Sequence, residues 1–186
     1  MSAQPAATGL LGFLTVERTE DGRGFVGAAM VTDERGFPLE FRATTPVRPS
    51  PVQKILFGGS LEPYVSVELC GRKLLKECQR KPGIVLVPKA SLLGLTSDSA
   101  LVVALTRAGE SIRIEQQTES ASDRTEGRID SDAFQPIIYE SHGSQDDLNK
   151  TVPVLQRCFR EFDLIEAFDR MRAALKLLAE EDPKFR

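Results

Sequence analysis

Apolar and polar side chains alternate along residues 39–44, the period of a strand with one buried and one exposed face. Two further strands are predicted at residues 12–18 and 25–32, separated by the turn residues 20–22. Residues 33–36, Asp-Glu-Arg-Gly, match a type I turn that ends in a left-handed glycine, a common hairpin connection. The pattern therefore predicts an antiparallel meander of three strands near the start of the chain.

A proline-rich corner follows the meander and leads into two helices. Ser50 and Gln53 have the spacing of a capping box, and Pro51 falls at the first helical position, where its missing N–H costs nothing. Gly58 is expected to end this short helix. Ser60 is predicted to cap the second helix, whose apolar residues recur every three or four positions. The buried stripe of that helix comprises Val67, Cys70, Leu74, Leu75 and Cys78.

The last helix of the chain carries a narrow apolar seam that must be covered. Asp163 and Glu166 have capping-box spacing, so the helix is predicted to begin there. The seam follows a heptad-like pattern. We expect the domain's own sheet to cover it, with docking of another chain as the alternative, in which Phe168 and Leu175 would bind the partner. The seam comprises Leu164, Phe168, Met171, Leu175 and Leu178.

The middle of the chain predicts further strands around a polar loop. Residues 84–87 are all apolar, as expected for a central strand covered on both faces, and residues 92–95 suggest one helical turn. A strand at residues 100–106 is predicted to pair with one at 111–116. Residues 118–133 are polar and acidic, and we expect them to form a mobile loop. The remaining predicted elements are a strand at 136–141 and a helix at 154–160.

These elements predict a single α+β domain over residues 9–186, a mainly antiparallel sheet covered by helices, preceded by a mobile segment at residues 1–8. A chain of 186 residues with 41% hydrophobic content suffices for one core and is short for two. No secretory signal and no apolar run of membrane-spanning length is found, which predicts a soluble protein. The three cysteines fall in helical patterns, which is typical of a reducing cytoplasm.

His142, the sole histidine, follows a predicted strand, where catalytic groups often lie. As a general base it would serve Cys70 or Ser60 in a small hydrolase. No G-x-S-x-G elbow or cysteine-protease motif accompanies it, so an exposed loop histidine is the favoured interpretation and no catalytic residue is assigned. Cys70 and Cys78 are eight residues apart with no C-x-x-C pair, so we predict core cysteines, no metal site and no cofactor.

The segment Gly58-Gly59-Ser60 at a predicted helix start is a second candidate site. Its backbone N–H groups, with Arg48 and Lys54 nearby in sequence, suit a phosphate or carboxylate, as in an anion-binding regulatory domain. An ordinary helix break is favoured, because the G-K-[ST] ending of a P-loop is absent.

The order of three antiparallel strands, a helix and a further strand is similar to that of RNase H-like folds. This resemblance implies a metal-dependent nuclease, which needs acids on the first and fourth strands to hold its metal ions. The first strand offers only Glu17 near its end, and residues 84–87 offer no acid. The nuclease interpretation is therefore disfavoured.

The distribution of charge favours a binding protein. A net charge of -3 and a pI near 5.4 argue against general nucleic-acid affinity. Residues 46–81 nevertheless carry a net charge of +4, whereas residues 110–147 carry -7. Such opposite charges suit docking, so the sequence predicts a non-catalytic cytoplasmic accessory subunit that binds a protein partner or a second copy, not a membrane or nucleic acid. The candidate partner-binding residues are Arg72, Lys73, Lys76, Phe168 and Leu175.

Overall fold

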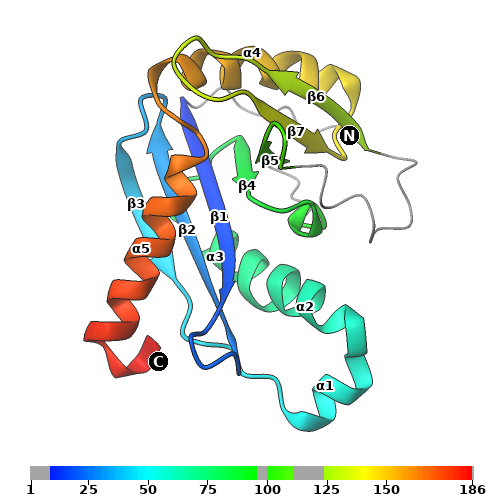
Figure 1. Ribbon diagram of the computed structural model, residues 1–186, viewed down its shortest axis with the longest axis vertical. Coiled ribbons are helices and arrows are strands. Elements are labelled where there is room, and N and C mark those ends of the chain that lie inside the picture. The colour runs from blue at the N-terminus through cyan, green and yellow to red at the C-terminus, as the bar shows by residue number, and fades with distance from the viewer. Residues whose placement is uncertain (1–8, 96–99, 111–123, 186) are drawn as a thin grey trace.

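The structure, a computed structural model, describes residues 9–95, 100–110 and 124–185. Within these residues the chain forms one sheet of seven strands, in the spatial order β3-β2-β1-β4-β5-β7-β6 (Figure 1). β4 runs parallel to both of its neighbours, β1 and β5, and the other neighbouring pairs are antiparallel. The strands are β1 (Leu10–Arg18), β2 (Phe25–Asp33), β3 (Pro38–Ala43), β4 (Ile84–Val87), β5 (Leu101–Arg107), β6 (Thr125–Ile129) and β7 (Ile137–Ser141).

The meander of β1, β2 and β3 is confirmed, and so is its second turn. Gly36 has a φ of 81°, the left-handed conformation that glycine adopts readily. The carboxylate of Asp33 accepts hydrogen bonds from the backbone N–H groups of Arg35 and Phe37, which stabilises the turn. The predicted class, a single α+β domain with a mainly antiparallel sheet, is also confirmed.

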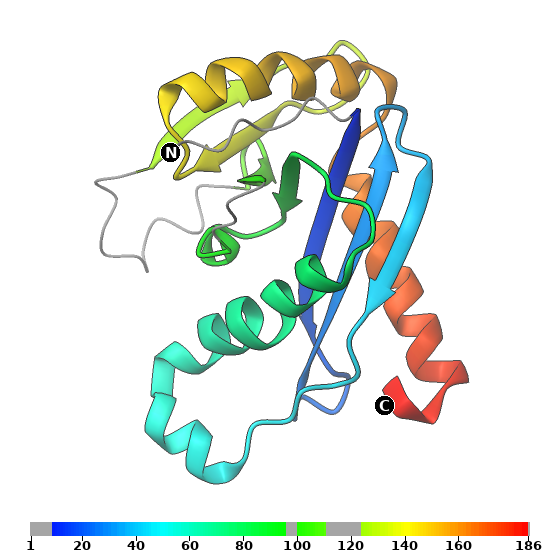
Figure 2. The same ribbon diagram turned by 180° about the vertical axis from the view of Figure 1, so that it is seen from behind.

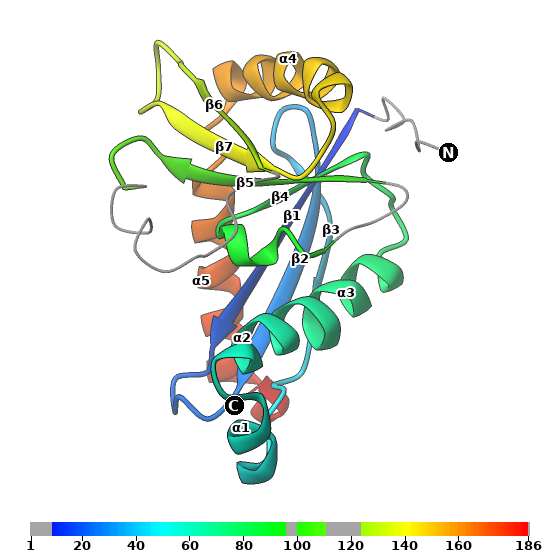
Figure 3. The same ribbon diagram turned by 90° about the vertical axis from the view of Figure 1, so that its right-hand side faces the viewer.

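Helices cover both faces of the sheet (Figure 3). On one face, α4 (Gln145–Glu161) packs over β6, and α5 (Glu166–Glu181) crosses β1 and β2. The core on this face includes Phe13 and Phe168, whose rings meet edge to face with centroids 5.6 Å apart. The opposite face is covered by the helical residues 61–77 and by the short turn η3 (Ala90–Leu92). None of the described helices is long and apolar enough to cross a membrane.

The helices between residues 51 and 77 form a continuous unit, here named the helical arm. The predicted capping box is present, because Ser50 Oγ accepts from the backbone N–H of Gln53 and Gln53 Oε1 accepts from that of Ser50. Gly58, with a φ of 49°, ends the first helix as predicted. The arm comprises α1 (Pro51–Phe57), η1 (Gly58–Ser60), α2 (Leu61–Tyr64), the π-helical η2 (Val65–Gly71) and α3 (Arg72–Glu77).

The arm contacts the sheet along its second half. A side chain at Gly27 on β2 would place a Cβ 3.0 Å from atoms of Cys70 and Leu74, so glycine there permits the close approach of η2 and α3. In contrast, α1 has no buried residue, and it projects away from the body of the domain (Figures 1 and 2). The arm is therefore anchored at one end and exposed at the other.

Two predicted helix caps are wrong. Ser60 does not cap the second helix, because its hydroxyl donates to the carbonyl of Phe57 at 2.7 Å. Asp163 does not form a capping box. Its carboxylate accepts a hydrogen bond from the backbone N–H of Ile165 and forms an ion pair with Arg107. In both cases the side chain bonds to a local backbone group outside the predicted capping arrangement.

The predicted polar loop at residues 118–133 is wrong in part. β6 (Thr125–Ile129) lies within it and pairs with β7, and Ile129 is buried in the core. The strand expected at residues 111–116, the rest of that loop up to residue 123, and the segment expected to be mobile at residues 1–8 lie outside the described residues.

Glu40 on the edge strand β3 ties the segment that follows the helical arm to the sheet. Its carboxylate accepts hydrogen bonds from the backbone N–H groups of Gln79, at 3.0 Å, and Arg80, at 2.9 Å. Partial burial raises the pKa of Glu40, but these two bonds and the adjacent Arg42 guanidinium outweigh burial and lower the pKa from 4.5 to about 2.

We expect Glu40→Gln to destabilise the protein in a pH-dependent manner. Because the pKa is lower in the folded state, the carboxylate contributes stability that is fully present above about pH 4.5 and is lost as the pH falls toward about 2. Urea unfolding of both proteins at several pH values measures the difference in unfolding free energy, which should shrink through this window. A difference that is equal at every pH would contradict the assignment.

Candidate functional site

Cys70 and His142, one pair predicted for a hydrolase, do not meet. His142 lies exposed after β7, whereas Cys70 lies buried in η2 against β2. Three strands separate β2 from β7, which places them four strand spacings, or roughly 19 Å, apart. A nucleophile and its general base must lie within hydrogen-bonding distance, so the hydrolase that pairs Cys70 with His142 is wrong. The other nucleophile named for it, Ser60, donates its hydroxyl to the carbonyl of Phe57.

The cysteines are structural. Cys70, Cys78 and Cys158 all lie within the described residues and are unoxidised and buried. Burial raises the pKa of each thiol, to about 11 for Cys70 and Cys158, so these thiols are protonated and unreactive at neutral pH. The prediction of core cysteines is confirmed, and a cytoplasmic location stays a prediction.

The anion site expected at Gly58-Gly59-Ser60 is not assembled by the contacts of its residues. The three residues form the turn η1, which joins α1 directly to α2, and the hydroxyl of Ser60 is used within that turn. Arg48 lies 3.6 Å from Asp21 of the β1–β2 turn. Of the two basic residues named for the site, Arg48 thus faces an acid, while Lys54 is exposed on α1, and an anion site here stays a prediction.

Phe168 and Leu175, named as candidate partner-binding residues, belong to the core. Their side chains are 0% and 6% exposed and pack in the cluster between α5 and the sheet. The domain's own sheet therefore covers the apolar seam of the last helix, as expected, and this seam offers no docking surface.

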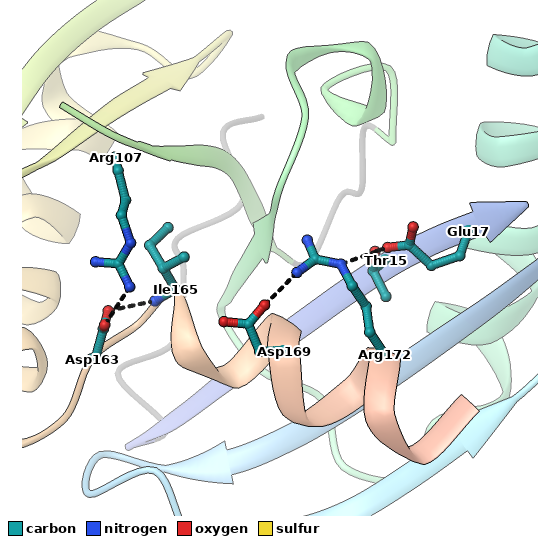
Figure 4. A network of polar contacts seen from close by, with 7 residues as sticks. All are labelled: Thr15, Glu17, Arg107, Asp163, Ile165, Asp169 and Arg172. Carbon is teal, nitrogen blue, oxygen red and sulfur yellow. Dashed lines mark hydrogen bonds and ion pairs between the residues drawn. The ribbon is translucent and has the colours of Figure 1, made fainter. Parts of the chain in front are cut away.

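A polar network joins α5 to the end of β1 (Figure 4). The guanidinium of Arg172 donates to Glu17 at 3.1 Å and to Asp169 at 2.6 Å. The buried hydroxyl of Thr15 also donates to Glu17, at 2.6 Å. Arg172 therefore lies between two carboxylates from different elements and neutralises part of their charge.

A second ion pair closes the same end of the sheet at β5. Arg107, the last residue of β5, donates to Asp163 at 2.6 Å, and Asp163 also accepts from the backbone N–H of Ile165 (Figure 4). Both charged side chains are largely buried. This pair fixes the start of α5 over the sheet.

The carboxylates at this end of the sheet do not fit a catalytic metal centre. Glu17, the acid on β1, is already bound by Arg172, and β4 has no acid. Basic residues instead occupy the ends of the parallel strands: Arg18 ends β1, Arg107 ends β5 and Lys89 follows β4 by two residues. Among the described residues there is no group of three histidines, cysteines or acids placed to hold a metal ion.

We expect Arg172→Met to expose the repulsion between Glu17 and Asp169. Methionine keeps much of the apolar length of the side chain but removes the charge, so unfolding free energy should fall by about 1 kcal/mol or less, as for an exposed ion pair. Millimolar Mg²⁺ should recover part of the lost melting temperature, relative to NaCl of equal ionic strength, whereas the wild type should not respond. The exposed pair of Arg128 with Asp130 gives the matched control, Arg128→Met. A wild type stabilised by Mg²⁺ as strongly as Arg172→Met would contradict this view of the network.

The exposed side of the helical arm carries basic residues with no protein partner. Lys54 on α1 and Lys73 and Lys76 on α3 are exposed, and none of their side chains makes a hydrogen bond or ion pair within the described chain. Arg72 differs, because it pairs with Glu68 at 2.8 Å one turn away. The arm therefore presents positive charge that is not neutralised from inside the domain.

The first helix of the arm also exposes apolar side chains. Val52, Ile55 and Leu56 of α1 are 63%, 80% and 77% exposed, and their spacing places them close together on the helix surface. At the end of α1, Phe57 stacks on Tyr64 with ring centroids 4.5 Å apart. The same helix thus carries Lys54 and an apolar face that the domain itself leaves uncovered. Apolar exposure of this density marks interaction surfaces.

Comparison with known proteins identifies the fold. No protein-family model matches this chain, and no curated protein matches its sequence. The structure of endonuclease V from Bacillus subtilis is similar with a TM-score of 0.58 and 11% identity, over 96% of this chain and 85% of that protein. Endonuclease V from Ciona intestinalis, in complex with a 24mer DNA containing an inosine followed by a ribo-adenosine, has a TM-score of 0.51 and 12% identity, over 91% of this chain and 87% of that protein.

These likenesses contradict two predictions made from the sequence. The first is the accessory subunit that binds a protein partner or a second copy, and the second is the exclusion of nucleic acid, since one of these structures holds DNA. The error has a physical cause. The net charge of -3 is an average over the chain, whereas contact with a phosphate depends on charges within about 10 Å, the screening length at moderate salt.

Proposed function

We propose that this protein binds nucleic acid and that the helical arm contacts it. The observation that carries the proposal is the fold shared along nearly the whole chain with endonuclease V, seen with DNA in the Ciona intestinalis protein. The arm supports it independently, because Lys54, Lys73 and Lys76 are exposed and unpaired within the described chain. Such side chains bind phosphates and release the counterions condensed on the nucleic acid.

The apolar surface of α1 gives the arm a second kind of contact. Ile55 and Leu56 are exposed on α1, the part of the arm that projects away from the body of the domain (Figure 1). Apolar side chains flanked by cations suit contact with unstacked bases or insertion between base steps, while the cations hold the backbone. In our proposal Lys54, Lys73 and Lys76 bind the phosphates, and the apolar side chains of α1 contact the bases.

The proposal covers binding and includes no hydrolytic step. Metal-assisted cleavage of a phosphodiester requires carboxylates that hold the metal ions. At the end of β1 the carboxylates of Glu17 and Asp169 hold Arg172 instead. Cleavage is therefore tested separately from binding.

The experiment measures fluorescence anisotropy of labelled oligonucleotides of about 25 residues, as single-stranded DNA, duplex DNA and RNA, from about 50 mM to 200 mM salt. We expect binding whose affinity falls steeply and log-linearly with salt concentration. Comparison of the three oligonucleotides then shows which form is preferred. Absence of binding to all three at the lowest salt would overturn the proposal. Incubation with Mg²⁺ or Mn²⁺ and analysis of the products on a denaturing gel tests for cleavage, and products absent from a Glu17→Gln control would extend the function to a nuclease.

A further inference from the structure

A cavity of about 430 Å³ opens between the turn that joins β1 to β2 and the C-terminal end of α5. The short helix η5 (Pro183–Phe185) folds back after α5 and brings Phe185 to its wall, and the chain end lies beside the β1–β2 turn in Figures 1 and 3. The floor is formed by Val26, Leu175 and Ala179. Its volume lies in the range of small-molecule sites, which are also largely apolar.

The rim of this cavity is acidic. Glu17, Glu20, Asp21 and Glu180 line it, against the basic residues Arg18 and Lys176. Arg18 does not balance these acids, because its guanidinium bonds to Glu62 of the helical arm and lies over the ring of Phe25, on the other face of the sheet.

Other residues of the protein neutralise or hydrogen-bond some of the acids that line the cavity. Glu17 is bound by Arg172, and Asp21 accepts hydrogen bonds from Thr19 and Arg23. Glu20 makes no hydrogen bond or ion pair within the described residues. The rim therefore presents at least one carboxylate that a ligand can reach, above an apolar floor.

We infer that this cavity is a binding site for a small organic cation, a primary amine that carries an apolar or aromatic body. The ammonium group bonds to Glu20 at the rim, and the body packs against Leu175, Ala179 and Phe185. An anionic ligand of the same shape is repelled by the rim. The cavity lies across the sheet from the helical arm, so this site is independent of the proposed nucleic-acid surface.

Three probes that share a phenylethyl body test the inference: 2-phenylethylamine, 2-phenylethanol and 3-phenylpropionate. Saturation-transfer NMR and thermal shift with the whole 186-residue chain measure their binding. We expect the amine to bind about fivefold more tightly than the alcohol, the gain from one partly exposed ion pair, and the carboxylate to bind most weakly.

Two variants locate the site. Glu20→Gln should reduce the amine to the affinity of the alcohol, and Ala179→Leu, which keeps a good helix former, should fill the floor and abolish binding of both. Glu126→Gln, an exposed acid on β6, is the matched control and should change nothing. No binding of any probe, equal binding of amine and carboxylate, or an amine affinity unchanged in Glu20→Gln would each overturn the inference. Variants in which the lysines of the helical arm are replaced should lose oligonucleotide binding and keep amine binding. That result would show that the two sites are independent.

Discussion

Replacing Lys54, Lys73 and Lys76 together by alanine should lower the affinity for an oligonucleotide at least about a hundredfold at low salt. Each lysine that contacts a phosphate contributes about 0.9 to the slope of log affinity against log salt for duplex DNA, so the slope should fall by nearly three. The three side chains are exposed and without partners in the described chain, and alanine favours helix, so the variant should fold normally. Anisotropy titrations over a salt series measure both quantities.

A matched variant distinguishes the loss of a specific contact surface from the loss of overall positive charge. Lys150, Lys176 and Lys184 are also exposed, but they lie on α4, α5 and η5, away from the arm. Their triple replacement by alanine removes the same net charge and should change affinity only slightly. If the two triple variants weaken binding equally, the helical arm is not the surface that contacts the nucleic acid, and another face of the protein must do so.

Replacing Phe168 by alanine should destabilise the protein by about 3 to 5 kcal/mol, the usual loss for a buried phenylalanine. Its ring is fully buried and packs edge to face on Phe13, so truncation leaves a cavity at the centre of the core between α5 and β1. A domain of this size is typically stable by about 5 to 15 kcal/mol, so the variant should be close to unfolding at moderate temperature. Guanidinium chloride unfolding, followed by circular dichroism, measures the change.

Leu177 provides the control on the same helix. It is 52% exposed, and Leu177→Ala should change stability by about 0.5 kcal/mol or less. Retained stability of Phe168→Ala with a changed assembly state by light scattering would show that α5 is a docking helix. That result would contradict the packing of its apolar seam on the sheet.

The elements that the sequence predicts correctly depend on neighbours along the chain. The capping box of Ser50 and Gln53, the helix end at Gly58 and the all-apolar strand β4 are local patterns, and each is found where expected. The stripe that includes Cys70 and Leu74 is likewise buried, because side chains three or four residues apart share one face of a helix.

The candidate site was only partly visible in the sequence. Lys73 and Lys76 were singled out by local charge, but the whole-chain charge led to the wrong class of partner. A better signal was the apolar pair Ile55 and Leu56 in the short helix after the proline corner, where both side chains are exposed. The π-helical winding of η2 gave no signal, because it arises where the arm packs on the sheet.

The sequence by itself determined the local elements, the buried stripes and the α+β class of this protein, since these follow from periodicity and turn chemistry over a few residues. Tertiary structure alone decided the strand order, which inserts β4 between β1 and β5. It also paired Arg172 with Glu17, 155 residues away, and formed the cavity at the end of α5. Such partners are brought together by the packing of whole helices on the sheet, and no pattern of neighbouring residues encodes which distant charge a side chain will meet.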